Sequence, residues 1–392
     1  MKNKDGWEIK KLGEVCEIFN GGTPNTLISE FWDGSNLWIT PKDMGRMKSI
    51  YIDDTERKIT EAGLKNSSAR ILPINSIVIS SRAPIGHLAI NTKPICTNQG
   101  CKGLVPKEGL DTQYLYYFLK NSVQLLNDLG TGATFKEISG TKLGNVTIPI
   151  PPLPTQHQIV SELDTLSDII SKKKQQIEEL DKLAQATFYD MFGDPVSNEK
   201  GLTVKTLGEI CEITSSKRIY AEEYQKEGIP FYRSKEIIEK GKKKPISLEL
   251  FISNERYNEI KNKFGIPEIG DILMTAVGTI GEIWVVDTDS PFYFKDGNIV
   301  WLKMNKSNNS TYFLFVLGLL VKEYKTKMAV GAAYSALTIV NLKNMKVVFP
   351  KLEIQTQFAT KIESIENQKA LINQSIGDVQ QLFDYTMDKY FN

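Results

Sequence analysis

The sequence predicts an α+β protein with two similar globular domains and two long helices that pair as an antiparallel coiled coil. Three observations carry this prediction. The 392-residue chain repeats itself at an offset of 195 to 199 residues. Both copies have the same order of strand-like and helix-like segments, and both end in a long stretch whose apolar residues recur at alternating intervals of four and three. If the two helices pair antiparallel, a pseudo-two-fold axis relates the copies.

The repeat is clearest near the start of each copy. Residues 12–18 read Leu-Gly-Glu-Val-Cys-Glu-Ile and residues 207–213 read Leu-Gly-Glu-Ile-Cys-Glu-Ile, so six of seven positions are identical. Further along, residues 112–115 match 311–314, and Pro151, Leu153, Gln156 and Gln158 recur as Pro350, Leu352, Gln355 and Gln357. A period this long indicates tandem domains, because solenoid repeats run about 20–50 residues.

Each copy begins with short apolar runs separated by Gly, Pro, Ser and Thr, which predict strands and turns. Such runs are residues 36–40, 71–80 and 269–276. A helical stretch follows at 112–129, with its counterpart at 311–327, and then a short strand at 146–150, with its counterpart at 346–349. The strand-rich part of each copy is long enough to bury a core of its own.

Pro154 and Thr155 open the first long helix, where Thr155 with Gln158 fits a capping box. The first helix has apolar or small seam residues at Ile159, Leu163, Leu166, Ile170, Ile177, Leu180, Ala184, Thr187 and Met191, with Lys173 as its one break. In the second helix the seam residues are Phe358, Ile362, Ile365, Lys369, Ile372, Ile376, Val379, Phe383, Thr386 and Tyr390. A stripe this narrow and long favours a helix pair over an ordinary core-packing helix, which is the alternative.

The predicted boundaries follow from these patterns. The first globular domain covers residues 1–154 and its helix 155–192; a linker at 193–201 leads to the second globular domain, 202–353, and its helix, 354–392. Gly193, Asp194 and Pro195 let the chain leave the first helix.

Composition excludes several classes of protein. Hydrophobic residues make up 41% and charged residues 24%, which is typical of globular proteins and not of disordered or fibrous ones. Lys and Arg number 48 and Asp and Glu 47, so a uniformly basic nucleic-acid coat is excluded while local basic patches are not. With four cysteines, no apolar h-region and no long apolar run, we expect a soluble cytoplasmic protein without a signal or a membrane span.

No catalytic motif stands out. The sequence has no phosphate-binding loop, and the glycine turn at 130–132 follows a predicted helix, whereas a dinucleotide site needs a strand there. Pro151-Pro152 lacks the polar residue that amino-methyltransferases place before their prolines. Cys96, Cys101 and His87 lack zinc-site spacing and have no counterpart in the second copy. We therefore predict no catalytic residue, no metal site and no cofactor.

Other segments suit recognition of DNA. Polar, basic and glycine-containing segments interrupt the strands at corresponding places in both copies, yet their chemistry differs: Arg82 corresponds to Val277, and Thr40 to Arg233. Arg, Asn, Gln and Lys read base edges, and Ser, Thr and backbone amides hold phosphates. The candidate DNA-binding residues are Thr23, Lys42, Arg46, Arg82, Gln99 and Lys136 in the first copy, and Lys217, Arg218, Arg233, Lys235, Asn298 and Tyr334 in the second.

The chain resembles the DNA-specificity subunits of type I restriction–modification systems over essentially its whole length. The motifs that carry the resemblance are Gly6-Trp7-Glu8-Ile9-Lys10-Lys11-Leu12-Gly13-Glu14, Gly21-Gly22-Thr23-Pro24, Ser80-Ser81-Arg82-Ala83-Pro84-Ile85-Gly86 and the segment 148–158, which enters a long helix. The second copy departs from them: Leu202-Thr203-Val204-Lys205 replaces Trp7-Glu8-Ile9-Lys10, Ser215-Ser216-Lys217 replaces the Gly-Gly-Thr-Pro turn, and Val277 replaces Arg82.

The resemblance implies a subunit without catalytic activity of its own. Each globular part would be a target recognition domain that lays loops into the major groove of one half of a split double-stranded DNA site. The coiled coil would set the spacing between half-sites and dock DNA methyltransferase subunits, two by symmetry; restriction/translocase subunits are further implied partners. The alternative from another class is a tandem-domain adaptor that binds proteins through its coiled coil and never touches DNA. A self-sufficient nuclease or methyltransferase lacks support from any motif.

Overall fold

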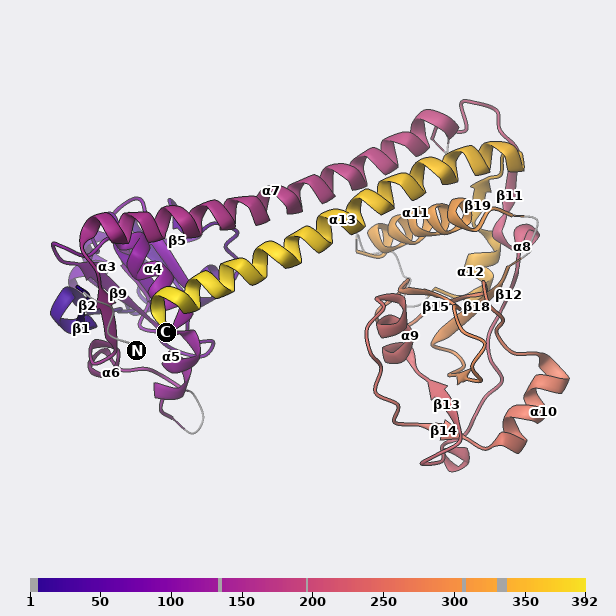
Figure 1. The fold of residues 1–392 in the computed structure, drawn as a ribbon, viewed down its shortest axis with the longest axis horizontal. Coiled ribbons are helices and arrows are strands. Elements are labelled where there is room, and N and C mark those ends of the chain that lie inside the picture. The colour runs from indigo at the N-terminus through magenta and orange to yellow at the C-terminus, as the bar shows by residue number, and fades with distance from the viewer. Residues whose placement is uncertain (1–5, 133–135, 195–196, 305–307, 330–336) are drawn as a thin grey trace. The chain divides into compact units, whose positions relative to one another are not determined.

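The computed structural model describes residues 6–132, 136–194, 197–304, 308–329 and 337–392 (Figure 1). It divides into two compact units. Unit 1 consists of Met1–Gln175 and Ile372–Asn392, and unit 2 of Gln176–Leu371. Each unit therefore contains one segment of each long helix.

Unit 1 contains three sheets. The largest has the strand order β2-β9-β6-β7-β4, the second has the order β5-β3-β8, and β1 pairs with β10. Their strands are β1 (Glu8–Lys11), β2 (Cys16–Asn20), β3 (Trp32–Ile39), β4 (Tyr51–Ile52), β5 (Arg57–Ile59), β6 (Ile77–Ser80), β7 (Leu88–Asn91), β8 (Ile95–Thr97), β9 (Cys101–Pro106) and β10 (Thr147–Ile150). The predicted strand 71–80 is thus confined to its second half, and the predicted strand 36–40 is the end of a longer one.

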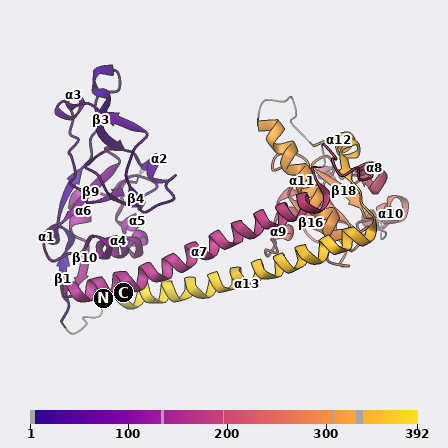
Figure 2. The same cartoon turned by 90° about the horizontal axis from the view of Figure 1, so that it is seen from above.

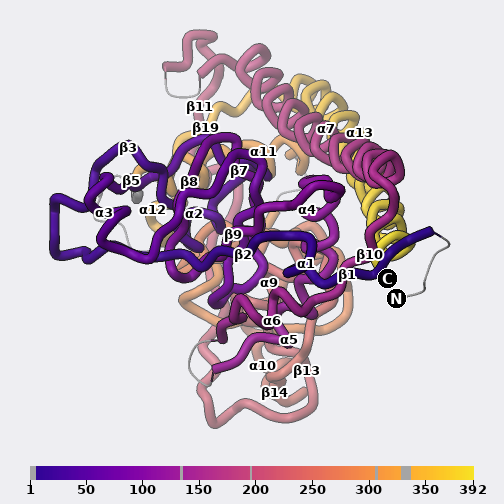
Figure 3. Tube along the Cα trace, turned by 90° about the vertical axis from the view of Figure 1, so that its left-hand side faces the viewer, coloured from indigo at the N-terminus to yellow at the C-terminus, as the bar shows by residue number. Residues whose placement is uncertain are grey.

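The helices of unit 1 connect and cover these sheets. They are α1 (Leu12–Val15), the 3-10 turn η1 (Ser29–Phe31), α2 (Pro41–Met44), α3 (Glu61–Lys65), α4 (Thr112–Asn121), α5 (Val123–Leu129), α6 (Gly140–Gly144) and the first part of α7 (Leu153–Phe192). Within this unit α4 lies on the side where α7 runs, and β3, β5 and α3 lie on the other side (Figures 2 and 3).

Unit 2 repeats this topology with the same neighbours, except that β4 has no counterpart among its described residues. Its sheets have the orders β12-β18-β15-β16, β14-β13-β17 and β11-β19. The strands are β11 (Val204–Thr206), β12 (Glu212–Thr214), β13 (Ile229–Tyr232), β14 (Phe251–Ile252), β15 (Ile272–Thr275), β16 (Ile283–Val285), β17 (Tyr293–Phe294), β18 (Ile299–Lys303) and β19 (Lys346–Val348). The helical elements are α8 (Leu207–Ile210), the 3-10 turn η2 (Ala221–Glu223), α9 (Ser234–Gly241), α10 (Asn254–Phe264), α11 (Ser310–Ala329), α12 (Ile339–Asn344) and the first part of α13 (Leu352–Phe391). The second part of α7 belongs to unit 2 and the second part of α13 to unit 1.

The registers of the two units also correspond. Ile18 lies opposite Leu104 in the β2–β9 pair, and Ile213 lies opposite Leu302 in the β12–β18 pair. Since the two sequences fold into the same strand orders, the predicted α+β fold with two similar domains is confirmed.

The long helices α7 and α13 are each 40 residues long and lie side by side within each unit (Figures 1 and 2). In unit 1, the Tyr390 hydroxyl donates to Glu162 Oε2 at 2.8 Å; in unit 2, Lys369 Nζ lies 2.7 Å from Asp181 Oδ1. As the residue number rises along one helix it falls along its partner, so the pair is antiparallel, as predicted. Lys369 thus occupies its seam position by pairing with an acidic residue of the other helix.

Two local predictions are wrong. Both long helices begin two residues early, at Leu153 and Leu352, so Thr155 is already inside the first turn of α7 and does not cap it. The amides of Thr155 and Gln156 bond to the Pro152 carbonyl. The predicted helical stretch 112–129 is two helices, which meet at Ser122. The Ser122 hydroxyl donates to the Phe118 carbonyl at 2.9 Å, which is how a serine side chain competes with a regular helical turn.

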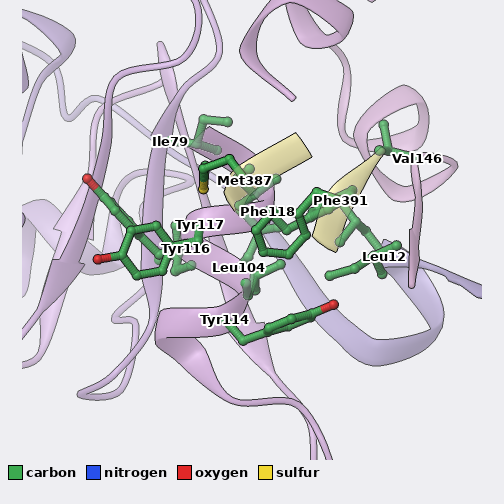
Figure 4. Close-up of a cluster of buried hydrophobic side chains, with 14 of the residues drawn as sticks. Leu12, Ile79, Leu104, Tyr114, Tyr116, Tyr117, Phe118, Val146, Met387 and Phe391 are labelled. Atoms are coloured by element: carbon green, nitrogen blue, oxygen red, sulfur yellow. The ribbon is translucent and has the colours of Figure 1, made fainter. Parts of the chain in front are cut away.

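The core of unit 1 joins α4 to the long helices (Figure 4). Tyr114 and Phe118 of α4 contact Phe391 of α13, with ring centroids 5.3 and 6.0 Å apart. Unit 2 has the equivalent arrangement, in which Phe192 of α7 contacts Tyr312 of α11, with ring centroids 5.2 Å apart. Each globular part therefore shares its hydrophobic core with the helix pair.

Candidate nucleic-acid interface

Arg82 lies in the connection between β6 and β7, which is closed by its own hydrogen bonds. The amide of Ser80 donates to the His87 carbonyl and the amide of Gly86 to the Ser80 carbonyl, at 2.9 and 3.1 Å. The Ser80 hydroxyl donates to the Pro84 carbonyl at 2.7 Å and accepts from the His87 amide at 2.8 Å. This buried serine fixes the path of the loop around Arg82.

Unit 2 builds the same loop between β15 and β16. Thr275 takes the place of Ser80: its amide donates to the Glu282 carbonyl at 3.0 Å, and its hydroxyl donates to the Thr279 carbonyl and accepts from the Glu282 amide. Val277 is exposed on this loop where unit 1 has Arg82. The hydrogen bonds that close the loop are thus the same in both units, while the presented side chain differs.

Four further segments of unit 1, which carry Thr23, Lys42 with Arg46, Gln99 and Lys136, lie near this loop. Ser81 donates its amide to the Gly100 carbonyl at 2.8 Å, and Ala83 donates to the Lys136 carbonyl at 3.2 Å. The remaining bonds connect the other segments: Asn98 amide to Ile39 carbonyl at 2.8 Å, Gly22 amide to Thr97 carbonyl at 2.9 Å, and Ile138 amide to Ser81 carbonyl at 2.9 Å. Candidates from residues 23 to 136 therefore belong to one face.

Arg82 is anchored at this face by a carboxylate. Its Nε lies 2.9 Å from Glu137 Oε2, and the Arg82 side chain is 44% exposed. The other oxygen of Glu137 lies 3.9 Å from Nζ of Lys102, whose side chain is 5% exposed. Lys102 also donates to Asn20 Oδ1 at 2.9 Å, and burial lowers its pKa.

The other candidates of unit 1 surround this group. Thr23 accepts a hydrogen bond from Asn98 Nδ2 at 2.9 Å. Gln99 follows Asn98 and Lys136 precedes Glu137 in the chain, and both side chains are exposed. Lys42 is exposed on α2, which Thr40 caps, and Arg46 is exposed just after α2 and lies 3.9 Å from Glu56. A β-carbon at Gly21 would lie 1.9 Å from the Asn98 carbonyl oxygen, so only glycine lets these two segments approach.

Unit 2 gathers Lys217, Arg218 and Asn298 in the corresponding place. Arg218 is 67% exposed, and its Nε lies 2.9 Å from Oδ2 of Asp296, which is 19% exposed. The Lys217 amide donates to the Tyr293 hydroxyl at 2.6 Å, and its Nζ lies 4.4 Å from the centre of the Phe264 ring. The Asn298 carbonyl accepts from the Ala276 amide at 2.8 Å, which connects this segment to the Val277 loop.

Arg233 and Lys235 form a separate ion-pair group at the start of α9. Arg233 Nη2 lies 2.8 Å from both Glu236 Oε1 and Glu249 Oε2, and Lys235 lies 3.2 Å from Glu249. The hydrogen bond to Glu236, which is nearly fully buried, and the one to Glu249 raise the Arg233 pKa. Arg233 is therefore committed to internal contacts more than Arg218 is. Tyr334 lies outside the described residues.

Lys102, Glu137 and Asp296 are further residues of these groups that the sequence pattern does not single out. Lys102 falls within an apolar strand, and the two acidic residues have no signature of their own. They gain a role only because the fold brings Glu137 to Arg82 and Asp296 to Arg218, residues 55 and 78 positions away.

No group of His, Cys, Asp and Glu with a metal-binding arrangement occurs among the described residues. Within the same residues, no helix is both long and apolar enough to cross a membrane.

Comparison with known proteins decides the family. The model of the type I restriction modification DNA specificity domain matches residues 4–181 and again 199–381. This chain belongs to that family. It is the DNA-specificity component of a type I restriction–modification enzyme, and this component is not itself catalytic.

Two relatives illustrate the range of similarity to this specificity subunit. The MjaIX specificity subunit of Methanocaldococcus jannaschii is 33% identical over 396 aligned residues, covering 93% of this chain and 89% of the relative. The EcoR124I/EcoR124II specificity subunit of Escherichia coli is 35% identical over 175 residues, covering 42% of this chain and 43% of the relative.

Solved structures agree in fold. A structure described as the S subunit of a type I restriction-modification system from M. genitalium has a TM-score of 0.52 at 18% identity, covering 100% of this chain and 98% of the other. A second, from work on complex assembly and conformational transition of the type I R-M system, has a TM-score of 0.65 at 18% identity and covers 100% and 99%.

Proposed function

We propose that each unit of this specificity subunit reads one half of a bipartite DNA site with the face described above. The supporting observation is the pair of loops at Arg82 and Val277, which share a backbone hydrogen-bond pattern but present different side chains. Two domains that read different half-sites require this combination of a shared loop structure and different side chains on it. In the proposed mechanism, phosphate contacts position each unit and base-edge contacts specify the sequence.

We assign base and phosphate contacts to the exposed residues of these faces. Arg82 and Gln99 in unit 1, and Arg218 and Asn298 in unit 2, carry side chains that read base edges. Contacts to phosphates are assigned to Lys42, Arg46, Lys136, Lys217 and Lys235. Thr23, which Asn98 holds in place, is assigned a polar contact with DNA. Arg233 orders the start of α9 through its ion pair with Glu236. Tyr334 stays a candidate on its sequence position alone.

The helix pair is the proposed docking surface for methyltransferase subunits. Leu183 of α7 and Leu382 of α13 are repeat equivalents, 199 positions apart, and each is 51% exposed. Apolar side chains at equivalent exposed positions fit one partner surface used twice, so we propose two methyltransferase subunits per chain. Restriction/translocase subunits complete the proposed complex. We place the complex in the cytoplasm, since four buried free cysteines suit a reducing compartment.

The test is to sequence modified bases in DNA methylated by the assembled complex. We expect one split motif with two defined halves and an unspecified spacer. Arg82→Ala should relax one position of one half, at about 1–3 kcal/mol, and leave the other half unchanged. Val340→Ala, an exposed change on α12, is the control. Methylation without a defined motif, or an assembled complex that never retains DNA, would favour the protein-binding adaptor instead.

A further inference from the structure

Both units contain an exposed arginine whose Nε is held by a carboxylate brought from a distant segment. We infer that Arg82 and Arg218 each contact a guanine base, one in each half-site. Glu137 and Asp296 are the positioning residues that hold these arginines in the orientation that selects guanine. This inference rests on the proposed function and deepens it.

The geometry leaves the reading end of each guanidinium available. Glu137 contacts Nε of Arg82 and Asp296 contacts Nε of Arg218, both at 2.9 Å. Among the described residues, the hydrogen bonds of both arginine side chains are made through Nε, and no hydrogen bond engages their terminal nitrogens. The two terminal amino groups can therefore donate together to O6 and N7 of guanine, the commonest bidentate contact of arginine in the major groove.

Each carboxylate is itself fixed. Glu137 exchanges backbone hydrogen bonds with Thr131, at 2.9 and 3.0 Å, and its second oxygen faces the buried Lys102. Asp296 is mostly buried, and the backbone of Lys295 beside it donates to the Tyr232 carbonyl at 2.9 Å. A fixed anion restricts the rotamers of a long arginine, so less freedom is lost when the arginine meets a base.

The two pairs lie at different places of the shared frame. Arg218 corresponds to Thr23, which Asn98 holds by a neutral hydrogen bond at 2.9 Å, whereas Arg82 corresponds to Val277. At the place of Arg218, the charged pair Arg218–Asp296 thus replaces the neutral pair Thr23–Asn98, which favours a role in reading over a role in folding.

The experiment measures base preference at every position of both half-sites, using the assembled complex and a randomised target library. Arg82→Ala and Glu137→Ala should both lower the preference for guanine at the same single position, Arg82→Ala by about 10- to 100-fold and Glu137→Ala by less. Arg218→Ala and Asp296→Ala should do the same at one position of the other half. The double variant Arg82→Ala/Glu137→Ala should lose no more than Arg82→Ala.

Two further variants separate positioning from folding. Glu137→Gln and Asp296→Asn keep an oxygen that can accept from Nε, so part of the guanine preference should return. Glu259→Ala removes the carboxylate from another arginine pair, with Arg256 on α10, and should leave both half-sites unchanged.

The outcomes distinguish this inference from the function on which it rests. A half-site without guanine on either strand, or a Glu137→Ala effect at a position other than that of Arg82→Ala, overturns the inference while the bipartite site stands. A complex without any sequence preference would overturn the proposed function itself.

Discussion

Gln156 is fully buried, yet every polar atom of its side chain is used. Its Oε1 accepts from the Asp111 amide at 2.8 Å, and its Nε2 donates to the carbonyls of Gly109 and Pro151 at 2.9 and 2.8 Å. Gln355 repeats this in unit 2, with the Asn309 amide and the Pro350 carbonyl. One side chain thereby joins the entry of a long helix to the loop before α4 or α11.

Replacing Gln156 by Leu should destabilise unit 1 by about 1–3 kcal/mol for each backbone group left unsatisfied. The measurement is the denaturant midpoint of the purified chain. Gln158→Leu is the matched control, because Gln158 is exposed on the next turn of α7. Equal midpoints for the two variants would show that the buried amide has no such role.

Because the cysteine thiols are buried, we expect the folded protein to lose stability at high pH. Burial raises the pKa of Cys16 and Cys211 to about 12 and that of Cys96 to about 11, above the ordinary value of 9.0. Above pH 9 the unfolded chain releases these protons while the folded chain keeps them, so stability is lost as the pH rises from 9 toward the folded values. Denaturant midpoints measured from pH 8 to 11 should fall, and Cys16→Ala should make the fall shallower. An unchanged slope in that variant would contradict the assignment.

At the scale of elements, the apolar seam of the long helices was predictable, because residues at the four–three spacing are the ones that become buried between helices. Leu163, Ile362 and Ile365 are buried as the four–three spacing predicts. The start of α7 and the break at Ser122 were not predictable, because both depend on a few local hydrogen bonds, to the carbonyls of Pro152 and Phe118, that compete with the sequence pattern. The proposed reading loops stand out in the sequence as polar segments, but Glu137 and Asp296 do not, because the Arg82–Glu137 and Arg218–Asp296 contacts join segments 55 and 78 residues apart.

Two leucines of α7 should behave in opposite ways. Leu163 is fully buried and Leu183 is 51% exposed. Leu163→Ala should lower the unfolding free energy by about 2–5 kcal/mol, as core truncations do. Leu183→Ala should leave stability within about 0.5 kcal/mol but weaken capture of methyltransferase subunits, most clearly together with Leu382→Ala. Thermal unfolding and a pull-down with the methyltransferase measure the two effects; full capture by the double variant would place docking elsewhere.

At the scale of the whole molecule, a net charge of +1 provides little general attraction to DNA. We expect weak DNA binding by the lone chain and tight, more salt-dependent binding by the assembled complex, because partner subunits would add phosphate contacts. Titrations at several salt concentrations measure both. Nanomolar specific binding by the lone chain at physiological salt would contradict this expectation.

If the long helices set the distance between the two half-sites, lengthening them should lengthen the unspecified spacer of the DNA target. Adding seven residues to α7 and seven at the matching place in α13 lengthens the pair by about 10 Å, at ~1.5 Å per residue, which is about three base pairs of DNA. The motif methylated by the assembled complex should keep both halves and gain about three unspecified positions. Replacing seven residues without adding any is the control, and an unchanged spacer would mean that the helices do not set the distance.

The shared core of unit 1 has a consequence for how the protein is made. Tyr114 and Phe118 pack against Phe391, and Met387 belongs to the same cluster, so residues from the far end of the chain complete the first unit. A ribosome synthesises the chain from its N-terminus, at about 5–20 residues per second. The first unit to emerge therefore leaves an apolar surface uncovered while the entire second copy is translated, and it is the last unit to be finished.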